Sequence, residues 1–272
     1  MRAFAEAWKP WLRSVVPVTL YDRMSQTKQR LVDALDTTPA YAHDGMRLYG
    51  KSLDFLSDPA FVRAYQAGMN TGHHICRAKG SVDDIHNEYR VYICCWAARS
   101  GLKLQGDFVE CGVNTGITSV AICSWLDFGT SAKQFYLFDT YRGIPIEQAT
   151  AGELRMKIHE NNEFYEECFT LAKENFAPWP NCVLVRGRVP DTLGRCLIQS
   201  VAYLHIDMNV AAPEIAAIEH FWPRLVTGGL VVLDDYGFVG YRPQKDAMDA
   251  WAARTGAVIA TLPTGQGLIV KT

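Results

Sequence analysis

The sequence predicts an α/β protein with a doubly wound, mostly parallel sheet, an N-terminal helical region and a terminal antiparallel hairpin. From residue 106 onward, short apolar runs alternate with stretches that have helical spacing of apolar residues. The runs are rich in β-branched residues, as expected of strands that are buried on both faces. Such an alternation indicates right-handed crossovers in a parallel sheet. A chain of 272 residues is long enough for one large domain, or for one domain with an appendage.

Residues 1–105 are expected to be helical and to serve as a cap or a dimerisation region. The stretch "SDPAFVRAYQAGM" begins with an Asp-Pro helix start. In "SVDDIHNEYRVYICCWAARSG", Ser81 is a candidate N-cap and Gly101 a C-terminal stop. A helical cap that closes over a ligand site would exclude water and shape the pocket.

Residues 106–272 are expected to form the ligand-binding domain. The predicted strands are "DFVEC", "QFYLFD", "CVLVRG", "VAYLHID", "GLVVLDD", "AVIATL" and "GLIVKT". The predicted helices are "TSVAICSWL", "FYEECFTLAKENF", residues 213–225 and "YRPQKDAMDAWAARTG". Only "PTGQ" joins the last two strands, which is too short for a crossover, so these strands are expected to pair as an antiparallel hairpin.

Composition argues against several classes of protein. The net charge is −2, from 27 basic and 29 acidic residues, so no bulk binding of nucleic acid is expected. The eight cysteines contain no C-x-x-C pair, which favours buried thiols in a reducing cytoplasm over a disulfide framework. The N-terminus carries charges and prolines throughout, so neither a signal peptide nor a transmembrane helix is expected.

The first ligand-binding loop is expected in "VECGVNTGITS", because small molecules bind such sheets beyond the carboxyl ends of the strands. Gly112 and Gly116 allow a ligand to approach the backbone, and the following helix offers free N–H groups to a carboxylate. Glu110 can hold the loop or an ammonium group. The motif lacks the full G-x-G-x-x-G dinucleotide fingerprint, and glycine-rich turns also occur for steric reasons alone.

Two further strand ends carry candidate binding residues. Asp139 follows the second strand, where an acid can accept hydrogen bonds from two ribose hydroxyls. The alternative is that Asp139 caps the following turn, because Asp is favoured in turns regardless of function. After the third strand, Gly187 and Arg188 stand at the expected edge of an adenine pocket, with Asp191 as a helix cap.

Three acids follow the fourth and fifth strands: Asp207, and the pair Asp234 and Asp235. One crossover helix separates these strands, so we expect them to be neighbours about 5 Å apart. Carboxylates that close either raise each other's pKa or bind a cation, and Mg²⁺ suits oxygen ligands. Such an ion could bind a substrate hydroxyl and lower its pKa. The alternative is that "DDYG" is a polar turn whose acids point to solvent.

As an ordered set, these motifs resemble the macrocin O-methyltransferase (TylF) family, which has the Rossmann-like class I S-adenosylmethionine methyltransferase fold. The resemblance covers residues 106–271, through "GDFVECGVNTG", "FDTYRGIP", Asp207, "GGLVVLDDYG" and "LPTGQGLIVK". It implies an O-methyltransferase that uses S-adenosylmethionine and acts on a hydroxyl of a sugar-bearing natural product or a glycan. A homodimer is expected by the same analogy.

The resemblance also implies roles for individual residues. Those implied at the methionine end of the cofactor are Glu110, Gly112, Val113 and Thr118. Asp139 is implied at the ribose, and Gly187 and Arg188 at the adenine. The implied Mg²⁺ ligands are Asp207, Asp234 and Asp235.

The chain departs from the family pattern in the loops nearest the acceptor. The family continues the fourth strand as Asp-x-Asp-Leu-Tyr, whereas this chain has Asn209 and Ala211 at the second acid and the aromatic position. Asn114-Thr115 replaces a bulky Trp-Arg in the first loop. Catechol-type enzymes place a lysine three positions after the first acid, and Val210 excludes a lysine base there.

The mechanism we expect is in-line methyl transfer, with Asp207 as metal ligand and base. Most of the rate gain would come from alignment of the reactants, which is worth ~7–11 kcal/mol in intramolecular models.

Three alternatives stay open. The first is a metal-independent methyltransferase, and the second is a nicotinamide-dependent oxidoreductase, which the missing third glycine and the terminal hairpin disfavour. The third is a non-catalytic nucleoside-binding module, which Asn209 and Ala211 keep open.

Overall fold

The computed structural model describes residues 17–35, 38–74 and 81–272. The chain divides into two compact units, Met1–Leu53 and Asp54–Thr272. The first unit contains helix α3 (Val18–Leu35), and its residues 1–16 lie outside the described residues. The described residues of the range 54–105 fold with the sheet in the second unit. The role of residues 1–105 as a cap or a dimerisation region stays a prediction.

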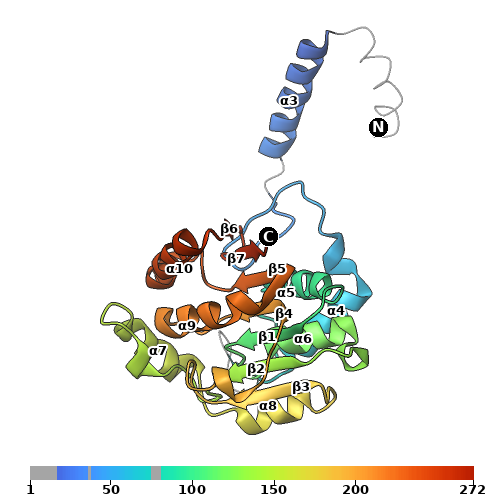
Figure 1. Ribbon diagram of the computed structural model, residues 1–272. Coiled ribbons are helices and arrows are strands. Elements are labelled where there is room, and N and C mark those ends of the chain that lie inside the picture. Colours follow the sequence, from blue (N-terminus) through green and yellow to red (C-terminus); the bar gives the residue numbers. More distant parts are fainter. Residues whose placement is uncertain (1–16, 36–37, 75–80) are drawn as a thin grey trace. The chain divides into compact units, whose positions relative to one another are not determined.

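A mixed sheet of seven strands organises the second unit, as the sequence predicts (Figure 1). The order is β3-β2-β1-β4-β5-β7-β6, in which β7 runs antiparallel to both β5 and β6 and the other neighbours are parallel. The strands are β1 (Asp107–Cys111), β2 (Phe135–Asp139), β3 (Cys182–Arg186), β4 (Val201–Ile206), β5 (Leu225–Leu233), β6 (Ala260–Thr261) and β7 (Gly267–Val270). The strand order reverses between β1 and β4, which is the position where doubly wound sheets bind ligands.

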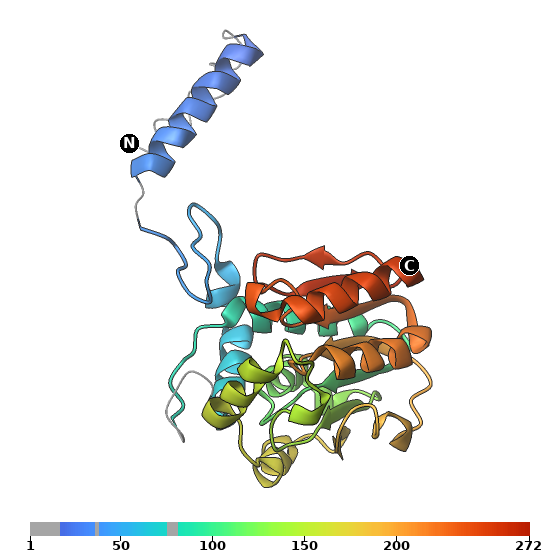
Figure 2. The same ribbon diagram turned by 90° about the vertical axis from the view of Figure 1, so that its left-hand side faces the viewer.

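Helices cover both faces of this sheet. Helices α4 (Pro59–Met69), α5 (Glu88–Gly101), α6 (Ile117–Leu126) and α8 (Phe169–Phe176) contribute to the core on the face that buries Phe108 and Tyr203. Helices α9 (Ala211–Phe221) and α10 (Arg242–Thr255) lie side by side over the other face, which buries Val109 and Leu204 (Figure 2). Burial on both faces explains why the strands are apolar throughout.

One further helix and several 3₁₀ turns complete the described chain. They are helix α7 (Leu154–Phe164) and the 3₁₀ turns Asp54–Ser57, Phe128–Thr130, Ile146–Gln148, Leu193–Arg195, Trp222–Arg224 and Val239–Tyr241. Among the described helices, none combines the length and the apolar character that crossing a bilayer requires.

Two helices begin or end elsewhere than the sequence predicts. Helix α5 begins at Glu88 rather than after Ser81, because Asp84 accepts hydrogen bonds from the Tyr65 hydroxyl (2.5 Å) and the His86 N–H (2.8 Å). His86 has φ +55°, which a right-handed helix does not allow. Of the helix predicted over residues 164–176, only the part from Phe169 is helical, as α8, because Tyr165 is extended (φ −121°, ψ 138°). Phe164 ends α7, a helix that was not predicted from the sequence. Long-range side-chain contacts, which local patterns do not contain, set both boundaries.

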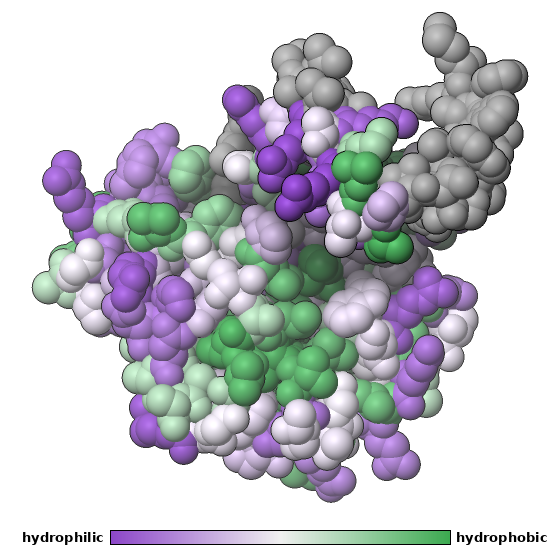
Figure 3. Space-filling view, turned by 90° about the horizontal axis from the view of Figure 1, so that it is seen from above, coloured by the Kyte–Doolittle hydropathy of each residue, from purple (hydrophilic) through white to green (hydrophobic). Residues whose placement is uncertain are grey.

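The surface of the protein carries apolar side chains among hydrophilic ones. On the face shown in Figure 3, apolar residues gather near the centre with hydrophilic residues around them. Large exposed apolar side chains of the second unit include Val62, Trp96, Leu197, Val239 and Val258. Contiguous apolar patches on a protein surface can mark interaction surfaces. The homodimer stays a prediction.

Gly68 tests the packing of α4 against α6. A Cβ at this position would overlap the carbonyl oxygen of Ile117. Alanine favours a helix over glycine by about 1 kcal/mol, but overpacking of a core costs ~1–3 kcal/mol. We expect the collision to dominate, so that Gly68→Ala lowers the melting temperature by about 2–6 °C in thermal denaturation. Gly194→Ala is the control, because nothing lies within 4 Å of the added Cβ. A melting temperature of Gly68→Ala equal to that of the wild type would contradict this packing.

Candidate active site

The carboxyl ends of the central strands meet at one edge of the sheet because parallel pairing continues past the strands. The Asp207 N–H donates to the Cys111 carbonyl (2.8 Å), and the Asp234 N–H donates to the Ile206 carbonyl (3.0 Å). The Gly112 N–H donates to the Phe138 carbonyl (2.9 Å). The first loop, the end of β2 and both acidic strand ends therefore lie at a common edge, as predicted.

The two glycines of the first loop are needed for steric reasons. Gly112 has φ +93°, and a Cβ there would overlap the carbonyl oxygen of Asp207. Gly116 has φ +102° at the N-terminus of α6, and a Cβ there would lie 2.6 Å from the ring of Phe176. Val113 is buried and Thr118 is half-buried in the first turn of α6. The roles of Gly112, Val113 and Thr118 at a cofactor stay predictions.

Asp139 ties the first loop to the turn after β2. Its Oδ2 accepts the N–H groups of Val113 (2.6 Å) and Asn114 (2.7 Å), and its Oδ1 accepts the Tyr141 N–H (2.6 Å). The turn-capping alternative therefore describes Asp139 in this structure. The Thr140 hydroxyl also lies 3.3 Å from Oδ1, but its single proton has a closer acceptor in the Gly143 carbonyl (2.6 Å). Because a carboxylate oxygen can accept two hydrogen bonds, Oδ1 then keeps capacity for a ribose hydroxyl. That second role stays a prediction.

Gly187 and Arg188 line a cavity of about 370 Å³ beside the turn after β2. The other lining residues are Thr140, Arg142, Arg186, Asp191 and Arg195. Arg188 forms ion pairs with Glu147 (2.7 Å) and Asp191 (2.9 Å), so the expected helix cap Asp191 pairs with Arg188 instead. The cavity lies where the sequence places an adenine pocket, and the adenine assignment stays a prediction.

A second cavity of about 290 Å³ adjoins the first loop at Asn114 and Thr115. Three carboxylates, those of Glu166, Glu167 and Glu174, are among its lining residues. Side chains of this charge can accept hydrogen bonds from an ammonium group. The cavity beside the glycine-rich loop is therefore lined by negative charge that suits the ammonium group of a ligand.

The acids after β5 are buried and paired, not directed into solvent. Asp234 and Asp235 are 8% and 9% exposed. The Arg90 guanidinium of α5 donates to both carboxylates, with 3.2 Å between Nη2 and the Asp235 Oδ1. The Asp234 Oδ1 also accepts a hydrogen bond from the Gln266 side chain (2.9 Å). This pairing excludes the alternative of a solvent-facing polar turn.

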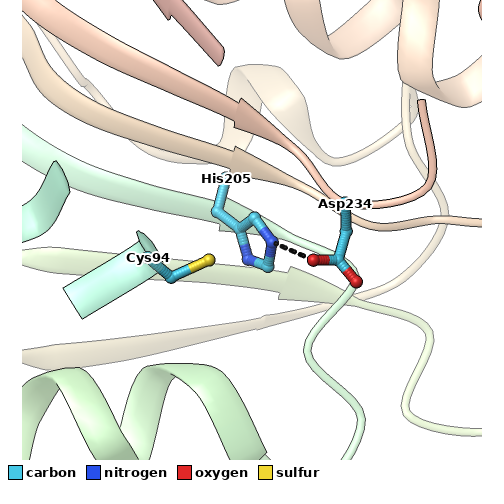
Figure 4. Close-up of side chains that lie close together, drawn as sticks. All are labelled: Cys94, His205 and Asp234. Carbon is cyan, nitrogen blue, oxygen red and sulfur yellow. Dashed lines mark ion pairs between the residues drawn. The ribbon is translucent and has the colours of Figure 1, made fainter. Parts of the chain in front are cut away.

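His205 connects these acids to the end of β1, and Figure 4 shows its ring between Cys94 and Asp234. Its Nδ1 lies 3.0 Å from the Glu110 Oε1, and its Nε2 lies 3.5 Å from the Asp234 Oδ1. Burial lowers the pKa of the fully buried His205, but the Cys94 sulfur and the Glu110 carboxylate raise it, and the net shift is well upward. Glu110, implied at the cofactor, faces this histidine. A continuous chain of ionisable groups therefore runs from Glu110 through His205 and Asp234 to Arg90 and Asp235.

Asp207 lies beside this chain in a half-buried position. Burial first, and then the nearby Asp235 carboxylate, raise the pKa of Asp207 to about 7. Its Oδ1 accepts a hydrogen bond from the Asn209 amide (3.4 Å), which also donates to the Tyr165 hydroxyl (3.3 Å). A carboxylate with a pKa near neutrality can accept a proton at physiological pH.

The three predicted metal ligands have suitable chemistry but are not gathered tightly. Within the described parts of the chain, Cys94–His205–Asp234 and Asp84–His86–Glu88 are the groups with three ligand atoms within 4.8 Å of one another. Asp207, Asp234 and Asp235 do not form such a group. Their oxygens still fit a hard divalent cation, and the Asp235 carboxylate adds, after burial, to the raised pKa of Asp207. The metal assignment stays a prediction.

Arg90 is the main feature of this site that sequence reasoning missed. It lies four residues before the buried Cys94, so both occupy one side of α5. A charged residue on the buried side of a helix indicates a buried partner, because arginine is rarely buried unpaired. That signal is present in the sequence, although it does not identify the partner.

Comparison with known proteins gives consistent results for the sheet-bearing part of the chain. The family model "Macrocin-O-methyltransferase (TylF)" matches residues 97–256. An 8-demethyl-8-(2,3-dimethoxy-alpha-L-rhamnosyl)-tetracenomycin-C 4'-O-methyltransferase of Streptomyces olivaceus is 28% identical over 160 residues, which are 56% of this chain and 60% of that protein. A demethyldecarbamoylnovobiocin O-methyltransferase of Streptomyces niveus is 26% identical over 161 residues, 57% of this chain and 61% of that protein.

The matches thus span about three fifths of the length of these curated relatives. Among solved structures, the O-methyltransferase NovP superposes with a TM-score of 0.66 at 20% identity, covering 78% of this chain and 98% of that one. At that identity the likeness concerns the fold, which is the predicted class I methyltransferase fold.

Asp139→Asn tests whether Asp139 holds the first loop in place when no ligand is bound. An asparagine has one acceptor oxygen and cannot receive the N–H groups on both sides of the wild-type carboxylate. We expect the ligand-free variant to lose about 1–3 kcal/mol of stability, seen as a melting temperature lower by at least about 2 °C. Asp191→Asn, at an exposed ion pair, is the control and should change little. An unchanged melting temperature for Asp139→Asn would reject the loop-holding role.

Proposed function

Because the chain belongs to the macrocin-O-methyltransferase (TylF) family, we propose that it is an S-adenosylmethionine-dependent O-methyltransferase. The proposed acceptor is a hydroxyl of a sugar or of a sugar-bearing natural product, in keeping with the named activities of its two relatives. The observation that carries the proposal is the shared edge of the sheet. There the glycine-rich loop, which adjoins one cavity, packs against the strand end that carries the half-buried Asp207, and the buried Asp234 and Asp235 follow the neighbouring strand. A second cavity lies at the end of β3.

Residues of the first three strand ends would hold the cofactor. Gly112, Val113 and Thr118 would surround the methionine end. Asp139 would accept a ribose hydroxyl through its Oδ1, and the cavity at Gly187 and Arg188 would receive the adenine. Glu110 would act indirectly in this arrangement, through its hydrogen bond to His205. When bound, S-adenosylmethionine supplies an electrophilic methyl group.

Asp207 is the proposed base. With a pKa of about 7, its carboxylate is substantially ionised near neutral pH and can take the proton of the acceptor hydroxyl. With the proton on Asp207, the acceptor oxygen would be able to form its bond to the methyl carbon as the carbon–sulfur bond of the donor breaks. The Asn209 amide holds the Asp207 Oδ1 and cannot itself act as a base.

Mg²⁺ assistance is part of the proposal, with Asp207, Asp234 and Asp235 as ligands. The oxygen donors and the repulsion between Asp207 and Asp235 support it. A metal-independent methyltransferase is the second candidate. It is favoured by the Arg90 guanidinium, which already supplies a positive charge to the acid pair.

We also propose that the protein works in a reducing cytoplasm and as a homodimer. The thiols of the described cysteines, most of them buried, support the first point. The second rests on the analogy with other small-molecule methyltransferases.

The experiment is a methyl-transfer assay with S-adenosylmethionine and rhamnosylated or related glycosylated aromatic acceptors, read by mass spectrometry. We expect a methylated sugar product. Asp207→Ala should lower turnover by at least ~10²-fold, while affinity for S-adenosylhomocysteine in calorimetry stays within a few-fold. Glu219→Gln, at an exposed ion pair, is the control carboxylate and should be fully active.

Chelation separates the two candidates. If Mg²⁺ assists, excess chelator should abolish turnover and added Mg²⁺ should restore it. Undiminished turnover in chelator would remove the metal from the proposal, whereas full activity of Asp207→Ala would remove the proposed base.

A further inference from the structure

We propose that Arg90 is the resident counter-cation of the Asp234–Asp235 pair, and that a divalent ion binds this pair only by displacing it. This proposal rests on the proposed Mg²⁺ assistance. It makes Arg90 of α5 a determinant of the affinity for metal. It concerns a side chain that lies outside the implied ligand set.

Arg90 reaches the acids from α5 and is itself largely enclosed. Its side chain is 20% exposed, and each of the two carboxylate side chains is 10% exposed. The guanidinium donates to both acids and lies over the Phe238 ring, 5.1 Å from its centre. A planar guanidinium that bridges two carboxylates and stacks on an aromatic ring has a defined position, unlike a solvated surface arginine.

Asp234 is fixed independently of Arg90. The fully buried Gln266 side chain donates to the Asp234 Oδ1 (2.9 Å) and to the Arg90 carbonyl oxygen (3.3 Å), which joins the acid to the backbone of α5. The His205 Nε2 lies 3.5 Å from the same carboxylate oxygen. The acid therefore stays in place when the arginine side chain moves, and Arg90 is the exchangeable partner.

The carboxylate oxygens that Arg90 contacts can be shared with the guanidinium or with a divalent ion, but not with both. Two adjacent carboxylates this far from water need a positive charge beside them, because an unpaired buried charge is strongly destabilising. A divalent ion on the same oxygens would meet the guanidinium at short range, and like charges repel strongly in a partly buried site. Arg90 and the ion therefore compete for the pair. The affinity for metal is therefore lowered by the free energy that is needed to displace the arginine.

Mn²⁺, which substitutes for Mg²⁺ and can be followed by electron paramagnetic resonance, tests the competition in the full chain. We expect Arg90→Met to bind Mn²⁺ at least ~10-fold more tightly than the wild type, because the competitor is gone. Arg90→Lys keeps a charge and should stay near the wild type. Arg254→Met, which breaks an exposed ion pair with Glu219, is the matched control and should leave Mn²⁺ affinity unchanged.

Thermal denaturation gives a second readout. In metal-free buffer Arg90→Met should melt below the wild type, and excess Mg²⁺ should raise its melting temperature more than that of the wild type. If Arg90→Met does not fold without metal, Arg90→Gln, which keeps hydrogen-bond donors, is measured in its place.

Equal or weaker Mn²⁺ binding by the folded neutral variants would overturn the inference. So would the absence of Mn²⁺ binding in every variant, even if methyl transfer were found. Tighter Mn²⁺ binding by Arg90→Met in a protein that transfers no methyl group would support the competition and reject the proposed function. The two failures are therefore distinguishable.

Discussion

Buried negative charge at the carboxyl edge of the sheet is the constraint on which the site depends. Glu110, Asp234 and Asp235 are each less than 10% exposed, and Asp207 lies beside them. Carboxylates cannot stay ionised in such surroundings without cationic or hydrogen-bonding partners. Arg90 supplies positive charge, the raised pKa of His205 favours its cationic form, and Gln266 supplies a further hydrogen bond. The helix before the sheet is thereby joined to the chemistry at its edge.

The backbone brings these groups together through register and alternation. Glu110 of β1 and His205 of β4 are cross-strand partners, and both share a sheet face with the residues two positions earlier, Phe108 and Tyr203. That face is covered by α5, which carries Arg90 and Cys94. On this face, polar residues therefore follow the apolar ones along each strand, toward the carboxyl edge of the sheet. The same helix covers the core and supplies the counter-charge.

Much of the architecture follows from local pattern. The apolar runs predict all seven strands, and the short "PTGQ" linker predicts the closing hairpin, which the structure confirms. The start of α5 and the break before α8 were wrong in the sequence prediction, because Tyr65 and Tyr165 form contacts with residues distant in sequence. The acidic edge was predictable from topology alone. Arg90 was not assigned, because its contact with Asp234 joins positions 144 residues apart and depends on the rotation of α5 over the sheet.

The protein neutralises its buried acids from within, and the ionisation state of His205 is the most direct test of this. Nitrogen-15 NMR of the imidazole, assigned by comparison with His205→Gln, reports whether one or both ring nitrogens carry a proton. The account predicts a doubly protonated, cationic ring at neutral pH, since the neighbouring groups raise the pKa of His205 well above its usual value. A neutral ring with one unprotonated nitrogen at neutral pH would contradict it.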